Sequence, residues 1–234
     1  MDELTYNGRQ FSEFNTFFDG SKAFGTPEKD YELVEIMGRN GSLSIYNDRF
    51  KDIALPFPCF IRSGFLTHFR DLTEFLNSQE GYLRLETSKE PNHFRMALFQ
   101  GVVDPITTPF NHGGQFTINF LAHPERWLKS GEQWITFAAP SGGINNYTLF
   151  NAKPIIRIYG AGEVGIGSET ITLTQAGTNY VDVDCDTMNA YEGATSFNKY
   201  LQVTDFPTLH PGRTGISLGD GITKIEIQPR WFEI

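Results

Sequence analysis

The stretch FLTHFRDLTEFL, residues 65–76, is the one convincing helical pattern in this chain of 234 residues. Its apolar side chains recur every three or four residues, and its charged side chains occupy the opposite face. We predict a single helix here, with Ser63 as its N-cap residue and Gly81 as the stop signal shortly beyond its end. An apolar stripe of this width normally packs on a sheet, so the rest of the chain is expected to supply one.

Short strands and turns are predicted on both sides of this helix. Upstream, strands at residues 31–37 and 43–46 are joined by Gly38-Arg39-Asn40-Gly41, in which Asn-Gly supplies the positive φ angles of a tight hairpin. A strand at residues 52–61 contains two prolines, which predicts an edge strand or a bulge. Downstream, alternating apolar residues predict three more strands, at residues 82–85, 94–98 and 116–120.

The segment 123–133 interrupts this pattern and divides the chain into two predicted domains, residues 1–130 and 131–234. Past it, short strands follow one another without helical periodicity, which is typical of an antiparallel sandwich. We therefore predict a mainly β fold with two β-sandwich-like domains, the first of which carries the single helix. The strands of the second domain are expected at residues 134–138, 154–159, 171–174, 180–185, 200–203, 215–218 and 222–227.

Composition and charge exclude several classes of function. The chain has 28 acidic and 19 basic residues, a formal net charge of −9 and no basic run. Binding to nucleic-acid phosphates or to an anionic membrane surface is therefore not expected. No apolar stretch approaches the ~20 residues that span a bilayer, and the acidic N-terminus does not resemble a signal peptide. We expect folding in a cytoplasm, with Cys59 and Cys185 as reduced, packed thiols.

The segment Gly160–Gly165 formally matches the dinucleotide-binding pattern GxGxxG. That fingerprint requires a helix directly after the glycines, because free N–H groups at the helix N-terminus hold the pyrophosphate. Residues 167–174 instead alternate and are rich in β-branched side chains, which predicts a strand. We interpret the motif as a hairpin turn and expect no nucleotide cofactor.

No catalytic or metal-binding pattern stands out elsewhere. Asp182, Asp184 and Asp186 alternate along a predicted strand without the central glycine and distal glutamate of a calcium loop, so we expect a solvated strand face. The five histidines form no spaced cluster, and neither a GxSxG elbow nor a cysteine-nucleophile signature occurs. We predict no catalytic, cofactor-binding or metal-binding residue, although a glycoside hydrolase with two unmarked carboxylates stays open.

The order of segments along the chain resembles that of the distal tail protein (Dit) family of long-tailed bacteriophages. The resemblance covers nearly the whole sequence in the same order. It is carried by Leu4–Gly8, the turn Ile36–Leu43, the 65–76 helix, Phe150–Gly160, the strand end Val183–Cys185 and the ending Pro229–Ile234.

This resemblance implies a structural protein of the virion, located at the phage tail tip and assembled in the cytoplasm of the bacterial host. The first domain would form a homo-hexameric ring, and the second would be a galectin-like β-sandwich around it. The implied partners are the tail tube protein and the tail-associated lysin or fibre protein, together with tape measure and receptor-binding proteins. No enzymatic activity is implied.

Two hypotheses concern the ring interface and the sugar site. The aromatic residues 1–30, with Phe17 and Phe18, are expected to act as an exchanged arm, and Arg39 and Asn40 as contacts at the hairpin tip; a solvated turn is the alternative. The His-Asn-Arg set and stacking Trp of galectins are not found in residues 133–234, and Trp134 and Trp231 are expected to close the core. A carbohydrate-binding β-sandwich module is the alternative function.

Overall fold

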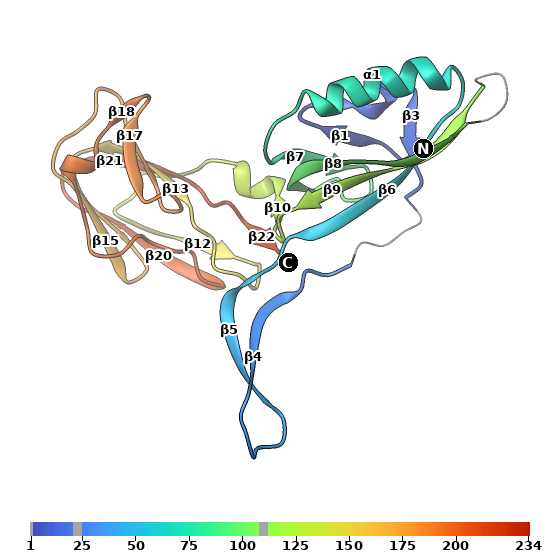
Figure 1. Ribbon diagram of the computed structural model, residues 1–234. Coiled ribbons are helices and arrows are strands. Elements are labelled where there is room, and N and C mark those ends of the chain that lie inside the picture. Colours follow the sequence, from blue (N-terminus) through green and yellow to red (C-terminus); the bar gives the residue numbers. More distant parts are fainter. Residues whose placement is uncertain (1, 21–24, 108–111) are drawn as a thin grey trace. The chain divides into compact units, whose positions relative to one another are not determined.

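The computed structural model describes residues 2–20, 25–107 and 112–234, which form two compact units (Figure 1). The first unit extends to Arg126 and includes Ile234, and the second consists of Trp127–Glu233. Strands dominate both units, and the described residues contain one α-helix. The predicted mainly β fold with a single helix is confirmed.

The first unit contains an antiparallel sheet in the order β2-β1-β7-β8-β9-β6-β3. Helix α1 (Phe65–Asn77) and the 3-10 helix η1 (Phe11–Phe14) bury apolar side chains in the core of this unit. Figure 1 shows α1 lying over one face of the sheet. The strands are β1 (Leu4–Tyr6), β2 (Arg9–Gln10), β3 (Thr16–Phe18), β6 (Ile53–Ile61), β7 (Leu83–Thr87), β8 (His93–Thr107) and β9 (Gly114–Ala122).

The predicted helix is confirmed, but its N-terminal cap differs. Gly64 occupies the N-cap position with a φ of 65°, a left-handed conformation that glycine adopts without a steric cost. Ser63 instead accepts hydrogen bonds from the amide of Asn15, at 3.1 Å on its carbonyl and 3.4 Å on its hydroxyl. Asn77 ends the helix, and Gly81 follows in the turn toward β7 with a φ of 75°.

Several side chains of residues 2–20 are part of the core of the first unit. Phe11, Phe14 and Phe18 are buried with Leu4 and Tyr6. Removing them would expose the apolar face of the sheet, so these aromatic residues belong to the core of the first unit, and the exchange of residues 1–30 between copies stays a prediction. One aromatic residue of that segment, Phe24, lies outside the described residues.

The predicted hairpin is present as β4 (Lys29–Glu35) and β5 (Ser42–Phe50). Its turn uses Gly38 and Gly41, with φ of 79° and 80°, whereas Asn40 does not adopt a positive φ. Among the described strands, β4 and β5 pair only with each other.

The proline-containing strand β6 also follows the prediction. It pairs with β9 along its whole length, but β3 covers its other edge only at Cys59–Ile61. Pro56 therefore lies where β6 is an edge strand, and its missing N–H leaves no ladder bond unmade.

The second unit consists of two antiparallel sheets, with orders β11-β21-β13-β16-β17-β18 and β12-β20-β14-β15-β19. Both sheets contribute to one apolar core, so the sandwich prediction is confirmed. The first sheet contains β11 (Ile135–Phe137), β21 (Ile222–Gln228), β13 (Ile155–Gly160), β16 (Val181–Asp184), β17 (Asn189–Glu192) and β18 (Thr195–Ser196). The second contains β12 (Ser141–Asn146), β20 (Gly212–Leu218), β14 (Gly162–Ile166), β15 (Glu169–Leu173) and β19 (Leu201–Val203).

Several short elements lie outside the two sheets of the sandwich. Strand β10 (Arg126–Leu128) pairs with β22 (Phe232–Glu233), and the Leu128 N–H donates to the Trp231 carbonyl at 2.9 Å. The 3-10 helices η3 (Lys129–Glu132) and η4 (Asn198–Tyr200) lie in the connections.

The GxGxxG segment connects the two sheets of the sandwich. It contains the end of β13 and the start of β14, which belong to different sheets, and strand β15 follows. The predicted hairpin turn is therefore a crossover, although the absence of the required helix is as expected. Gly160 and Gly162 have φ of 115° and 151°, and a side chain at either would collide with the backbone of Asp220 or Gly221. These glycines permit a close approach of two chain segments.

Candidate subunit interface

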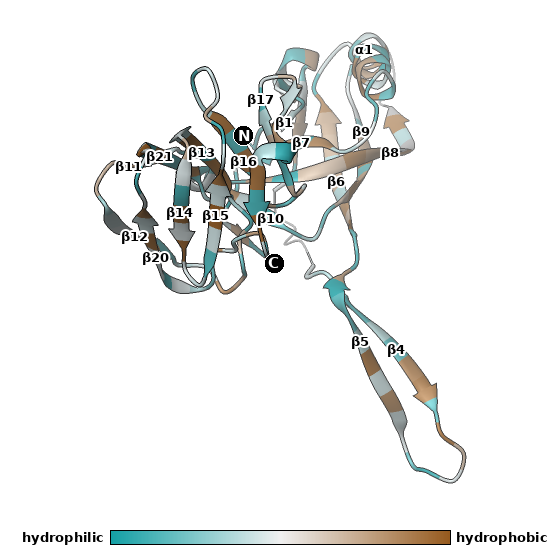
Figure 2. Cartoon of the chain, turned by 90° about the vertical axis from the view of Figure 1, so that its left-hand side faces the viewer, coloured by the Kyte–Doolittle hydropathy of each residue, from teal (hydrophilic) through white to brown (hydrophobic). Residues whose placement is uncertain are grey.

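The hairpin β4–β5 exposes apolar side chains on one of its faces. Val34 lies directly opposite Leu43, and Ile45 follows two residues further along β5. These three side chains and Ile36 are between 36% and 43% exposed. Figure 2 shows the apolar bands on both strands. We call these four residues the aliphatic strip.

The opposite face of the same hairpin is also uncovered. Tyr31 and Tyr46 face each other with ring centroids 5.1 Å apart, and they are 46% and 36% exposed. Leu33, on the same face, is 67% exposed. A two-stranded hairpin with two bare faces gains little hydrophobic stabilisation by itself, and in water such a hairpin is marginally stable.

Charged residues fix the base of the hairpin. The Arg49 guanidinium donates to the Asp30 carboxylate at 2.6 Å, and Lys51 lies 4.0 Å from the same carboxylate. The hydrogen bond from Arg49 holds the pKa of Asp30 below its usual value. The backbone N–H of Lys51 donates to the Glu28 carbonyl at 2.8 Å. The hairpin is therefore anchored at its base while its strands and tip stay exposed.

The four predicted interface residues lie on two different elements. Arg39 and Asn40 are exposed at the hairpin tip beside Met37, whose side chain is fully exposed. Phe17 is half-buried on β3, with its ring 5.9 Å from that of Phe60. Phe18 points the opposite way, because successive side chains of a strand alternate.

Burial removes Phe18 from the surface. Its side chain is 4% exposed and packs edge-on against Phe57 with centroids 5.6 Å apart. It therefore stabilises the core, and we withdraw it as an interface residue. The sequence also did not identify the aliphatic strip as exposed, since its alternation is that of any half-buried strand.

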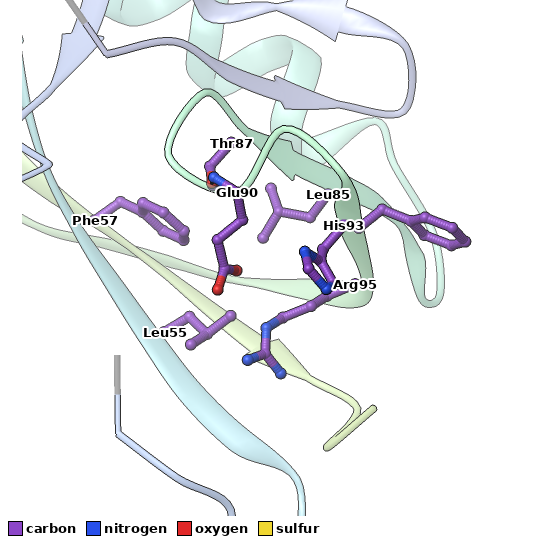
Figure 3. A pocket seen from close by; sticks show the side chains of 8 residues that line it. Leu55, Phe57, Leu85, Thr87, Glu90, His93 and Arg95 are labelled. Atoms are coloured by element: carbon purple, nitrogen blue, oxygen red, sulfur yellow. The ribbon is translucent and has the colours of Figure 1, made fainter. Parts of the chain in front are cut away.

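The cavity in Figure 3 lies among β6, β7 and β8 and is lined by charged as well as apolar side chains. Glu90, His93 and Arg95 surround a space of about 10 Å³, which is enough for one water molecule. Arg126 donates to Glu90 at 2.8 Å, and Arg95 donates to the Pro124 carbonyl at 3.2 Å. This cavity is too small for a substrate, so its charged groups have a structural role.

The aspartate run on β16 is covered rather than solvated. Asp182 and Asp184 are 8% and 6% exposed, and each receives two hydrogen bonds from one arginine, Arg157 and Arg230 respectively. Burial alone would raise the pKa of Asp184, but hydrogen bonds from Arg230 and from nearby backbone N–H groups reverse this effect and lower it. The prediction of a solvated face is therefore wrong for Asp182 and Asp184, whereas Asp186, just beyond the end of β16, is exposed as predicted.

The two tryptophans differ in their surroundings. Trp231 is 8% exposed and belongs to the core of the second unit, as predicted. Trp134 is 37% exposed, and the Arg157 guanidinium lies 4.3 Å from its ring centroid and 4.0 Å from that of Tyr180. Trp134 therefore covers an ion pair on the outer face of the sheet and does not close the core.

Across the residues that the structure describes, no group of three or more His, Cys, Asp or Glu side chains could hold a metal ion. Cys59 and Cys185 are both buried free thiols, and burial raises the pKa of Cys185 to about 12. Thiols in this state are poor nucleophiles. Within the same described ranges, every helix is too short or too polar to cross a membrane.

Comparison with known proteins identifies the fold. No family model and no curated protein matches this sequence. The chain is similar in structure to the Dit protein of phage SPP1, described as a paradigm of the hub adsorption apparatus in phages that infect Gram-positive bacteria. That match has a TM-score of 0.73 and 15% identity, and it covers 100% of both chains.

Two structures of the phage P2 baseplate in its activated conformation are also similar. The calcium form matches with a TM-score of 0.52 and 8% identity, and the strontium form with 0.53 and 10%; each match covers 97% of both chains. The chain therefore has the Dit fold over its whole length. The resemblance stated from sequence is confirmed for the fold, and the galectin-like character of the second unit stays a prediction.

Proposed function

We propose that this protein is a structural subunit of a phage tail tip, a distal tail protein without chemistry of its own. The observation that carries the proposal is that the fold of the SPP1 hub protein extends over the whole of both chains. In this proposal, six copies form a ring through the domain of residues 1–130. The domain of residues 131–234 lies around that ring.

The hairpin is proposed as the main contact between neighbouring copies. Exposed hydrophobic strands are a liability in a monomer unless another chain covers them. Head-to-tail contacts of this kind generate a closed ring when the rotation between copies allows it. The aliphatic strip would contact the next copy, with Arg39 and Asn40 at the tip and Phe17 as further contacts.

The partners follow from the same proposal. The ring would join the tail tube protein on one side and the tail-associated lysin or fibre protein on the other. Tape measure and receptor-binding proteins would be further neighbours. The protein would be assembled in the cytoplasm of the bacterial host and function in the virion.

The mass of the purified particle tests the proposal. Six copies of 26.4 kDa give 6 × 26.4 = 158.4 kDa, so mass photometry should record a particle near that mass. Negative-stain class averages should then have sixfold symmetry. A monomer at every concentration up to ~100 μM, a range in which even weak specific contacts are populated, would reject the ring.

The glycoside hydrolase alternative receives no support from the buried carboxylates. Asp182 and Asp184 are each bound by an arginine and are therefore occupied. The carbohydrate-binding alternative is different, because a hollow in the second unit has suitable chemistry.

A further inference from the structure

A hollow of about 340 Å³ lies on the second unit, beside the turn between β14 and β15. Its walls come from three segments, namely that turn, the start of β20 and the loop between β19 and β20. Sites for small ligands typically have a volume of ~300–1,000 Å³ and a few convergent polar groups, and this hollow meets both conditions. Its polar side chains are those of Ser168, Glu169, Asp205, Thr208, His210 and Arg213, together with the buried Thr214.

The loop wall of the hollow is held rigidly. Leu209 is fully buried and exchanges two backbone hydrogen bonds with Ala152, at 2.8 and 3.1 Å. The buried Asn146 side chain donates to the Leu209 carbonyl at 2.8 Å. Thr208 and His210 flank Leu209 and line the hollow. Because Leu209 is held in place, the backbone that carries these two polar side chains is fixed before any ligand arrives. Fixed groups lose little entropy on binding.

The His210 ring is oriented by two neighbours. Its Nδ1 lies 3.0 Å from the Asn151 side-chain oxygen, and its Nε2 lies 3.3 Å from the Thr208 hydroxyl. An amide oxygen only accepts, so Nδ1 is the nitrogen that donates to Asn151.

The Arg213 guanidinium is exposed and has no hydrogen-bond or ion-pair partner within the described residues. It lies against β12, where a side chain at Gly143 would come within 2.6 Å of its Nε. Glycine at this position thus leaves room for the guanidinium, whose five donors stay available. Asp205 is also exposed, and its carboxylate accepts one hydrogen bond, 2.8 Å from the N–H of Phe206.

The chemistry of these groups selects the class of ligand. Arg213 donates, and Asp205 and Glu169 accept. The Ser168 hydroxyl already donates to Glu169 at 2.9 Å and the Thr208 hydroxyl is paired with His210 at 3.3 Å, so their free lone pairs are what they offer as acceptors. One arginine against two carboxylates gives no excess of positive charge, which disfavours an anionic ligand. A ligand dense in hydroxyl groups, each a donor and an acceptor, satisfies such a mixed set. The half-buried Phe206 supplies an apolar surface for the C–H face of a ring.

We propose that this hollow binds one or two rings of a neutral saccharide. The inference is independent of the hexamer, because it concerns one subunit and would hold for a monomer. It also differs from the sheet-face site expected of galectins, since its groups come from a turn, a loop and the start of β20.

The test uses the full chain and a named panel of sugars. The panel contains glucose, galactose, rhamnose, N-acetylglucosamine, N-acetylgalactosamine, maltose, lactose and chitobiose. Saturation-transfer NMR should detect at least one of them, and calorimetry should give a Kd of about 1 mM or tighter. Arg213→Ala and Asp205→Ala should each weaken that binding about tenfold, as expected for the loss of a hydrogen bond to a charged group.

The controls separate a lost site from a lost fold. Lys153→Ala and Asp186→Asn alter an exposed ion pair elsewhere on the same unit and should leave the Kd unchanged. The melting temperature of all four variants should equal that of the parent, since the altered side chains are exposed. The proposal is overturned if no sugar of the panel binds at ~20 mM, or if both pocket variants bind as tightly as the parent.

Discussion

The Arg230 guanidinium donates two parallel hydrogen bonds to the Asp184 carboxylate, at 2.8 and 3.0 Å. Arg230 adopts a left-handed backbone conformation with a φ of 58°, and its N–H donates to the Gly131 carbonyl at 2.9 Å. The pair thus links the last residues of the chain to the middle of the sandwich, and the carboxylate it holds is almost fully buried.

Removing this guanidinium should destabilise the second unit. Arg230→Met keeps the apolar stem but leaves the buried Asp184 charge without its cation. Breaking such a pair typically costs ~3 kcal/mol. Urea unfolding followed by tryptophan fluorescence measures the loss. The control Lys153→Met affects an ion pair whose side chains are 51% and 53% exposed, and it should cost less than ~1 kcal/mol.

The same carboxylate predicts a pH dependence. Its folded pKa lies below the unfolded value, so the stabilisation is present above the unfolded pKa, near 3.8, and is lost as the pH falls through the folded pKa. The free energy of unfolding should therefore decrease below about pH 4. The Asp184→Asn variant should be less stable at neutral pH, and its free energy of unfolding should decrease less steeply below about pH 4. If that variant loses stability at low pH as steeply as the parent does, other carboxylates cause the loss.

A methyl group at the sheet crossover should be poorly tolerated. Gly160→Ala places a Cβ against the Gly221 carbonyl oxygen and forces a φ of 115° on an alanine. The expected loss is ~2 kcal/mol or more, from strain and displaced backbone. Gly215→Ala is the matched control, since its Cβ would meet no atom within 4 Å. In thermal unfolding, Gly160→Ala should have a clearly lower melting temperature than Gly215→Ala. Equal melting temperatures would contradict the requirement for glycine at the crossover.

The aliphatic strip should govern assembly without affecting the fold of the subunit. Replacing Val34, Leu43 and Ile45 with threonine keeps the β propensity and removes apolar surface. The proposed ring should then dissociate at a concentration at least tenfold higher, as measured by mass photometry. Leu149→Thr, at a site 85% exposed on the second unit, is the control and should assemble normally. Assembly that is unaffected by the triple substitution would place the interface elsewhere.

Local patterns predicted the elements in which one face is buried. The 65–76 helix, the Asn-Gly hairpin and the proline strand β6 each carry their own periodicity or turn residues, and all three are present. Strand β12 was missed because its sequence, SGGINN, has two adjacent glycines and no apolar alternation. The prediction of Ser63 as the N-cap residue was wrong. Gly64 occupies the N-cap position, with a positive φ that residues other than glycine disfavour.

Long-range contacts could not be predicted in this way. Asp182 and Asp184 look solvated in sequence, since their arginines lie 25 and 46 residues away. Phe17 and Phe18 are indistinguishable in a short strand without knowledge of which face meets α1. The hollow beside β20 is assembled from three segments whose residues carry no shared motif.

The hairpin has one further consequence, which concerns timing. Neither apolar core contains a residue of β4 or β5. In the proposed ring, each subunit would therefore reach its folded state before its hairpin meets a partner, and the energy of ring closure would not be used to fold the chain. Folding and assembly are then separate steps, of which only the second depends on protein concentration.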